Sequence, residues 1–176
     1  MKSILEKVVK NIQKEISVDI KYLNQGGCGW FAYFMVSNLK AMGFDAKIKL
    51  ITRGKNSIWY SLEDDIIFKK NLLNTYMNEG RENCDENQLE YLSFSHCFVS
   101  VNGLNFDGEV LNKVRLRSEY RGYKFEGEYT LEELEIALKE GGWNNTYKKE
   151  KYNQRLQNII ERNLNQLKQK RLELQN

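Results

Sequence analysis

Apolar side chains recur every three or four residues in several stretches of the chain, a spacing that places them on one face of an α-helix. Thr130 with Glu133 forms a capping box, and Gly43 and Gly141-Gly142 follow helical stretches as stop signals. The first stretch mixes its apolar positions with lysine and glutamate, so we expect an amphipathic helix packed on the body and no signal peptide. The stretches predicted as helices are residues 4–16, 30–42, 62–79, 131–138 and 156–174.

Alternating apolar and polar residues predict strands over residues 47–52 and 111–125, with a β-hairpin between them in the chain. Asn102-Gly103 predicts a two-residue type I′ turn, which needs positive φ at both positions and pairs Val101 with Leu104. Because side chains alternate along a strand, this register separates a core face from a mostly polar face. The core face carries Cys97, Val99, Val101, Leu104 and Phe106, and the other carries His96, Phe98, Ser100, Asn105, Asp107 and Glu109.

His96 is the only histidine in the chain, so no other residue can supply an imidazole base. In the predicted register Asp107 is its diagonal neighbour on the same face, about 7–8 Å away at the backbone and within side-chain reach. A carboxylate in this place can orient the ring and stabilise its cation. Glu109, which the register places directly across from His96, is the alternative orienting carboxylate.

Cys28 lies in a glycine-rich segment, residues 24–29, directly before a helical stretch that begins at Trp30. We therefore expect Cys28 in the first turn of a helix, where partial positive charge and free N–H groups stabilise a thiolate and a developing oxyanion. Gly27 and Gly29 would let a substrate backbone approach closely. A lone cysteine is more often a small core residue. The sole histidine and a same-face aspartate reverse that expectation in favour of a nucleophile.

Residues 26–32 with the following helix, the strand over 46–50, and His96 followed by Asp107-Gly108 together resemble the core of the transglutaminase-like and papain-like cysteine enzymes. The resemblance implies an α+β fold in which a helix carrying the cysteine packs on an antiparallel sheet that supplies the histidine and the aspartate. Aspartate as the third member resembles the transglutaminase-like branch, since papain uses asparagine.

The chain departs from the papain-like pattern at the glutamine of the oxyanion hole. Papain-like enzymes place this glutamine farther before the cysteine, where the present chain has Tyr22, whereas Gln25 lies only three residues before Cys28. The backbone N–H of Cys28 is therefore the better oxyanion donor. The candidate oxyanion and substrate-binding residues are Gln25, Gly27, Gly29 and Trp30.

These residues predict a cysteine-dependent acyl-transfer enzyme. Cys28 attacks an amide or ester carbonyl and forms a thioester, His96 moves the protons, and Asp107 orients the imidazole. We expect hydrolysis of peptide or isopeptide amides first, glutamine deamidation or cross-linking second, and acyl transfer to a small amine third. The alternative class is a protein- or nucleic-acid-binding module on the same fold, without turnover.

Composition limits the class and the compartment of the protein. A hydrophobic content of 41% over 176 residues indicates a folded chain, and no apolar run is long enough for a membrane span. The three cysteines are an odd number without metal-ligand spacing, so we expect free thiols in a reducing cytoplasm and neither metal nor cofactor. The abundant lysine and asparagine are typical of an AT-rich bacterial or viral genome, so the cytoplasm is that of the producing cell or of a viral host.

The region between the cysteine and histidine segments resembles an insertion. Ser61 and Asp64 resemble a capping box at the start of its helix, and the polar residues 80–88 predict a surface loop. Cys84 in that loop is expected to be an exposed bystander. By analogy with enzymes of this class, we expect the insertion to lie over the cleft and to help choose the substrate.

Residues 148–176 differ from the catalytic domain predicted over residues 1–147. They carry eight basic and three acidic residues, a net charge of +5 against +3 for the whole chain, which leaves −2 for the preceding residues. The apolar spacing predicts an amphipathic helix that docks on the body, mediates self-association or partner binding, or contacts nucleic acid or an anionic surface. Arginines and tyrosines within residues 111–125 are typical of a solvated basic edge, so a peptide or protein partner is expected and nucleic acid is not.

Overall fold

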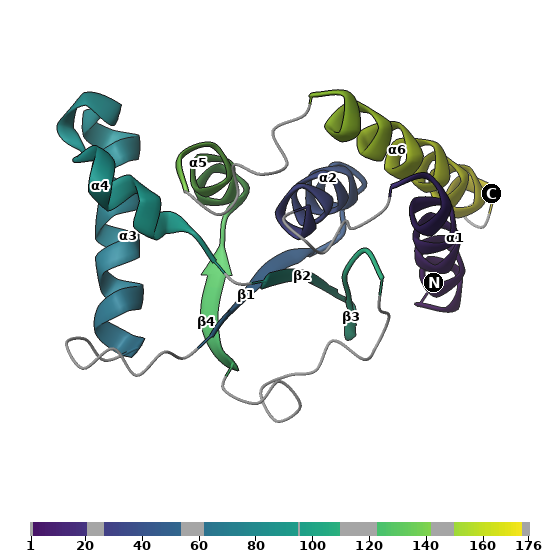
Figure 1. Ribbon diagram of the computed structural model, residues 1–176. Helices are drawn as coiled ribbons and strands as arrows, with labels where there is room; N and C mark the ends of the chain where they lie inside the picture. Colours follow the sequence, from purple (N-terminus) through teal and green to yellow (C-terminus); the bar gives the residue numbers. More distant parts are fainter. Residues whose placement is uncertain are drawn as a thin grey trace.

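The computed structural model describes residues 2–20, 27–53, 62–94, 96–109, 123–141 and 150–173. These residues form an α+β fold with an antiparallel sheet in the order β3-β2-β1-β4 (Figure 1). The expected fold class is confirmed at this level. The strands are β1 (Lys47–Arg53), β2 (His96–Val101), β3 (Leu104–Phe106) and β4 (Tyr123–Tyr129), and the helices are α1 (Lys2–Asp19), α2 (Cys28–Ala41), α3 (Leu62–Glu79), α4 (Glu86–Leu89), α5 (Leu131–Glu140) and α6 (Glu150–Glu173).

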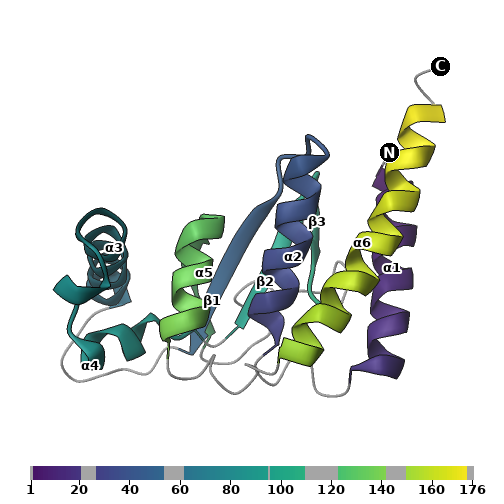
Figure 2. The ribbon, with the colours of Figure 1, turned by 90° about the horizontal axis from the view of Figure 1, so that it is seen from above.

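The helices are arranged along one face and both edges of the sheet. Helix α2 packs on β2 and β1, α5 contacts β4, α1 contacts the edge strand β3, and α3 contacts β4 (Figure 1). Viewed from above, α3, α5, α2, α6 and α1 follow one another across the molecule (Figure 2). The cysteine-bearing helix therefore lies over the strand that carries His96, as expected for a helix packed on an antiparallel sheet.

The hydrophobic core lies between α2 and the sheet and continues to α1 and α6. The whole predicted core face of the hairpin is buried in it, from Cys97 to Phe106. Helix α2 buries the side chains along one of its faces, because its apolar residues recur at helical spacing. The buried residues of α2 are Cys28, Gly29, Phe31, Ala32, Met35, Val36 and Leu39.

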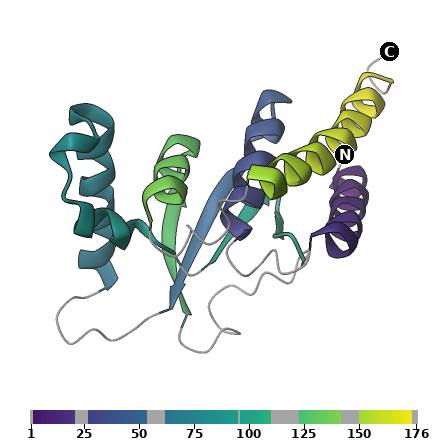
Figure 3. The same cartoon turned by 45° about the horizontal axis from the view of Figure 1, so that its top comes forward.

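Helix α6 docks on the body. Its apolar residues belong to the same core as those of α1 and α2, and α6 lies against both helices (Figure 3). Of the three predictions for this helix, docking on the body is therefore the one that the structure confirms. Contacts of α6 with a partner or a second copy remain predictions. The residues of α6 that are buried in the core are Leu156, Ile159, Ile160, Leu164 and Leu167.

Two local expectations need correction. Residues 80–88 are not a plain loop, because a 3₁₀ turn forms at Arg81–Asn83 and α4 follows at Glu86–Leu89. Asp85 caps α4 by accepting a hydrogen bond from the Asn87 backbone N–H at 2.7 Å. Leu89, the last residue of α4, is buried. Cys84 is half-buried at the margin of the core and is not fully exposed. Burial, as the largest cause, raises the pKa of its thiol.

Several sequence expectations lie outside the described residues. These are the turn after β1, the capping residue Ser61, and most of the predicted strand region over residues 111–125. In the part of the chain that the structure describes, no helix is both long and apolar enough to cross a bilayer.

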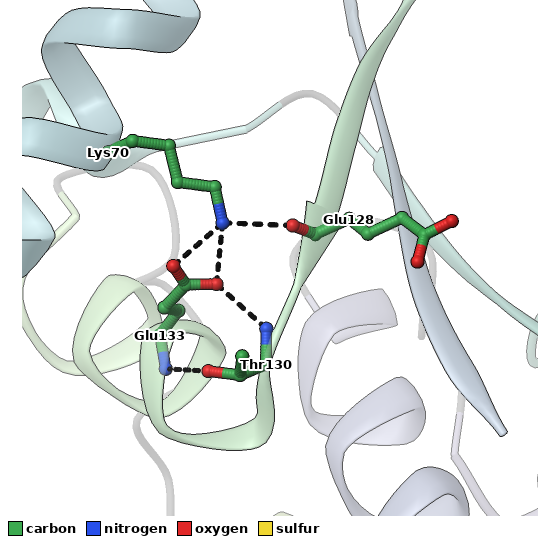
Figure 4. Close-up of polar contacts among 4 residues, drawn as sticks. All are labelled: Lys70, Glu128, Thr130 and Glu133. Atoms are coloured by element: carbon green, nitrogen blue, oxygen red, sulfur yellow. Dashed lines mark hydrogen bonds and ion pairs between the residues drawn. The ribbon is translucent and has the colours of Figure 1, made fainter. Parts of the chain in front are cut away.

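A polar cluster joins α3 to β4 and α5 (Figure 4). Thr130 and Glu133 form the expected capping box, with the Glu133 N–H donating to Thr130 Oγ1 at 3.1 Å and the Thr130 N–H donating to Glu133 Oε2 at 2.8 Å. The ammonium group of Lys70 donates to both Glu133 oxygens, at 2.7 and 2.6 Å, and to the Glu128 carbonyl at 3.0 Å. The capping carboxylate therefore also anchors α3.

Candidate active site

The β2–β3 hairpin brings the histidine next to a buried aspartate. Asn102 and Gly103 have φ values of 50° and 72°, as a type I′ turn requires, and the register pairs Val101 with Leu104. His96 is the first residue of β2 and Asp107 directly follows β3. His96 Nε2 and Asp107 Oδ2 are 2.9 Å apart. The expected register and the expected contact between His96 and Asp107 are both confirmed.

Glu109 does not take the place that the extended register assigned to it. The β2–β3 ladder ends at Phe106, because the chain then turns out of the sheet. Asp107 Oδ1 accepts a hydrogen bond from the Glu109 backbone N–H at 2.8 Å, which stabilises this turn. The Glu109 side chain is exposed. Glu109 therefore supports Asp107 through its main chain, and the carboxylate that meets His96 is that of Asp107.

Asp107 is held on several sides at once. The residue is only 2% exposed, and each of its two carboxylate oxygens has a hydrogen-bond partner. Its backbone carbonyl accepts a hydrogen bond from Gln13 Nε2 of α1 at 2.9 Å. No sequence signal pointed to Gln13, since the two residues are 94 positions apart in the chain. The carboxylate that orients His96 thus has few conformations open to it.

Cys28 is the first residue of α2, as expected. Gly27 is the N-cap, provides no side-chain cap, and accepts the first backbone hydrogen bond of the helix from the Phe31 N–H at 3.0 Å. The N–H groups of Cys28, Gly29 and Trp30 therefore have no acceptor within the helix. Such groups carry the positive end of the helix dipole and stabilise negative charge on a thiolate or an oxyanion.

The Cys28 thiol lies close enough to the side chains of Cys97 and His96 for both to lower its pKa. The Cys97 hydrogen bond is the largest influence on the Cys28 pKa, and together with the bond and the charge of His96 it outweighs burial and lowers that pKa well below its ordinary value. Burial opposes the charge on His96 most strongly, but hydrogen bonds to Asp107 and Cys28 and their charges raise its pKa to about 10. At neutral pH these shifts favour a thiolate–imidazolium pair.

Cys97 is a member of the site that sequence reasoning assigned only to the core. It is fully buried, and burial together with the neighbouring Cys28 raises the pKa of its thiol well above the ordinary value. Cys97 therefore stays protonated and can donate its hydrogen bond to the Cys28 thiolate. Two features of the sequence could have identified Cys97 as a site residue: it directly follows His96, and it lies on the face of β2 that α2 covers.

The other candidate residues have different surroundings. A Cβ atom on Gly29 would lie 2.4 Å from Leu138 Cδ2, so this glycine allows the close approach of α5. Trp30 follows Cys28 by two residues, which places it about 200° around the helix. The centroid of its ring lies 6.0 Å from those of Tyr33 and Phe34, in an aromatic cluster that packs against the core. Gln25 lies outside the described residues.

The arrangement contains the parts of an acyl-transfer site. A cysteine with a lowered pKa, a histidine within hydrogen-bonding distance of a buried carboxylate, and N–H groups without an acceptor inside the helix converge at the start of α2. Among the described residues, no group of three or more histidine, cysteine, aspartate or glutamate side chains is placed to hold a metal ion.

Comparison of the chain with protein-family models, with curated protein sequences and with solved structures found no match.

Proposed function

We propose that this protein is a cysteine-dependent acyl-transfer enzyme that hydrolyses peptide or isopeptide amides through a thioester on Cys28. The observation that carries the proposal is the 2.9 Å contact between His96 Nε2 and Asp107 Oδ2, with Cys28 close enough to the same imidazole for His96 to lower the pKa of its thiol. Cys28 begins α2, His96 begins β2 and Asp107 directly follows β3, so Cys28 lies far in the sequence from the hairpin that brings the other two together.

The geometry supports a division of roles between the two ring nitrogens of His96. Nε2 faces Asp107, so Nδ1 is the nitrogen left for Cys28. The thiolate attacks the carbonyl carbon, and the N–H groups at the start of α2 stabilise the oxyanion that forms. The imidazolium then protonates the leaving amine as the C–N bond breaks. Neutral His96 takes a proton from water, which attacks the thioester, releases the acid and restores the thiolate–imidazolium pair.

The fold supports the same proposal at the level of architecture. A helix with cysteine at its N-terminus packs on an antiparallel sheet whose neighbouring strands carry the histidine and the aspartate. In this the chain resembles the papain-like and transglutaminase-like enzymes, and membership of that superfamily is part of the proposal. The alternative is glutamine modification with an amine acceptor, which the transglutaminase-like branch performs. Assays with different substrates distinguish this reaction from hydrolysis.

The first test is selective alkylation. A brief exposure to limiting iodoacetamide at pH 7, followed by mass spectrometry, compares the labelling rates of Cys28 and Cys84. Cys28 is 5% exposed and Cys84 is half-buried, so accessibility alone favours Cys84. Faster labelling of Cys28 that is lost in His96→Ala and reduced in Asp107→Asn supports an activated nucleophile. Labelling of Cys28 no faster than that of Cys84 would count against the proposal.

The second test assigns the reaction. The full chain and its Cys28→Ala variant are incubated with peptide amides, an isopeptide-linked peptide pair and a glutamine peptide, each with and without a primary amine. We expect release of amine from the peptide or isopeptide substrate and no turnover by Cys28→Ala. Deamidation or amine incorporation at glutamine would instead assign the transglutaminase-like reaction to the same cysteine.

A further inference from the structure

The backbone carbonyl of Asp107, directly after the edge strand β3, accepts a hydrogen bond from another part of the chain. β3 is an edge strand of the sheet, and its pairing with β2 runs from Leu104 to Phe106. The carbonyl of Asp107 is instead bonded to the side-chain amide of Gln13 at 2.9 Å. A buried carbonyl is rarely left without a partner, so this bond fixes the peptide plane from which the Asp107 side chain extends.

Helix α1, which carries Gln13, is itself held in place by α6. Two residues after Gln13, Glu15 pairs with Arg162 and accepts a hydrogen bond at 3.1 Å from Asn163 Nδ2, and Asn163 is 3% exposed. α1 and α6 lie side by side in Figure 2. The apolar residues that α1 buries in the shared core are Leu5, Val8, Val9, Ile12 and Ile16.

We propose that Gln13 is a positioning residue for the candidate triad, and that the α1–α6 pair is the support from which it holds Asp107 in register with His96. This inference rests on the proposed function, since a triad has to be positioned only if it performs chemistry. A hydrogen bond near 2.9 Å loses strength steeply when the partners rotate apart. A small rotation of the Asp107 peptide therefore loosens the carboxylate from the ring without removing any triad residue.

The test compares variants of matching shape. Gln13→Met keeps the length and helix propensity of the side chain but removes the donor, and Gln13→Glu is a second variant without the donor. Asn11→Met is the matched control, because Asn11 is an exposed residue of the same helix. In each full-length protein, the rate of Cys28 alkylation is measured against pH. The titration of His96 is followed by NMR, since the only histidine of the chain has a single set of ring signals.

We expect Gln13→Met to slow Cys28 alkylation at pH 7 about tenfold and to lower the pH at which His96 loses its proton. Asn11→Met should behave as wild type. In an Asp107→Asn background, Gln13→Met should add little, because Gln13 acts through that carboxylate. A purely structural role would shift thermal unfolding but leave the His96 titration where it is.

The inference is overturned if both Gln13 variants reproduce the wild-type pH profiles, or if Gln13→Met slows alkylation equally with and without the Asp107 carboxylate. This failure is distinct from that of the proposed function. In the first case wild-type Cys28 remains activated and dependent on His96, and only the positioning role is lost. If wild-type Cys28 shows no activation, the function and the inference fall together.

Discussion

The two edges of the sheet are held in different ways. At the β3 edge, α1, α2 and α6 share a continuous apolar core, and the polar contacts among Cys28, His96 and Asp107 lie within or directly beside it. At the β4 edge, α3 also buries Leu72 and Leu73 in this core, but several of its polar contacts lie where water partly reaches them. Lys70 meets Glu133, and Tyr76 and Arg81 both donate to Glu140, at 2.9 and 3.1 Å.

The difference between the two edges shows how burial controls the strength of electrostatic interactions in this domain. Charges strongly perturb one another where burial keeps water away, which is the case at Cys28 and His96. The α3 edge has exposed apolar side chains as well, and the rings of Phe68 and Tyr91 meet at 6.3 Å on its surface. Changes at the β3 edge should therefore alter reactivity, and changes at the β4 edge should alter the attachment of α3 alone.

The largest expected effect follows from His96→Ala. Without the imidazolium, the Cys28 thiolate loses a hydrogen bond and an opposite charge in a buried place, so alkylation of Cys28 at pH 7 should fall about 100-fold. Cys84 in the same molecules is the internal control, because it lies outside the site and should label at an unchanged rate. An unchanged rate of Cys28 alkylation would show that the β3 edge does not control reactivity through His96.

The second prediction concerns the pH dependence of stability. The pKa of Cys28 is lowered below 9.0, so its contribution is lost as pH falls, whereas the pKa of His96 is raised from 6.5 to about 10, so its contribution is lost as pH rises through that range. The folded pair holds one proton, as the unfolded pair does between pH 6.5 and 9.0. The free energy of unfolding should therefore be greatest in that window.

Urea unfolding across pH, relative to a Cys28→Ala/His96→Ala double variant, isolates this contribution. Outside the window the difference should decrease by at most about 1.4 kcal/mol per pH unit. A difference that keeps rising from pH 6.5 to 9.0 would mean that the pair does not share one proton in the folded protein.

The third prediction is made at the β4 edge. Lys70→Met leaves the Glu133 carboxylate, whose side chain is 8% exposed, without its cation, and should lower the free energy of unfolding by about 1–3 kcal/mol. Lys139→Met is the matched control, since its ion pair with Glu135 is exposed and is worth about 0.5 kcal/mol or less. Chemical denaturation measures both. Cys28 alkylation should be unchanged in either variant, and a change would show that the edges are coupled.

The smallest effect on Cys28 is expected from Cys97, because removing this largest single influence on the Cys28 pKa still leaves both the hydrogen bonding and the charge of His96. Cys97→Ala removes the hydrogen-bond donor to the Cys28 thiolate and should raise the pKa of Cys28, which slows its alkylation at pH 7 about fivefold. Cys97→Ser restores a donor and should recover most of the rate. Equal rates in the alanine and serine variants would indicate that Cys97 contributes packing alone.

Local signals predicted the elements that local interactions decide. Asn102-Gly103 specified the hairpin register and Thr130 with Glu133 specified the start of α5, because each acts within a few residues. The end of β3 was missed, since the Asp107 carboxylate competes with the ladder for backbone donors. Helix α4 was missed because a polar composition hides the Asp85 cap and the single buried anchor Leu89.

The sequence by itself determined that one histidine exists, and it predicted that a cysteine lies in the first turn of a helix and that an aspartate on the returning strand lies close to that histidine. Only the tertiary structure decided that the start of α2 meets the start of β2. That contact places Cys97 beside Cys28 and leaves Gly29 facing α5, and the packing of α1 brings Gln13 to Asp107. Hydrogen bonds between residues far apart in the chain leave no periodic trace in the sequence, because they depend on how whole elements pack.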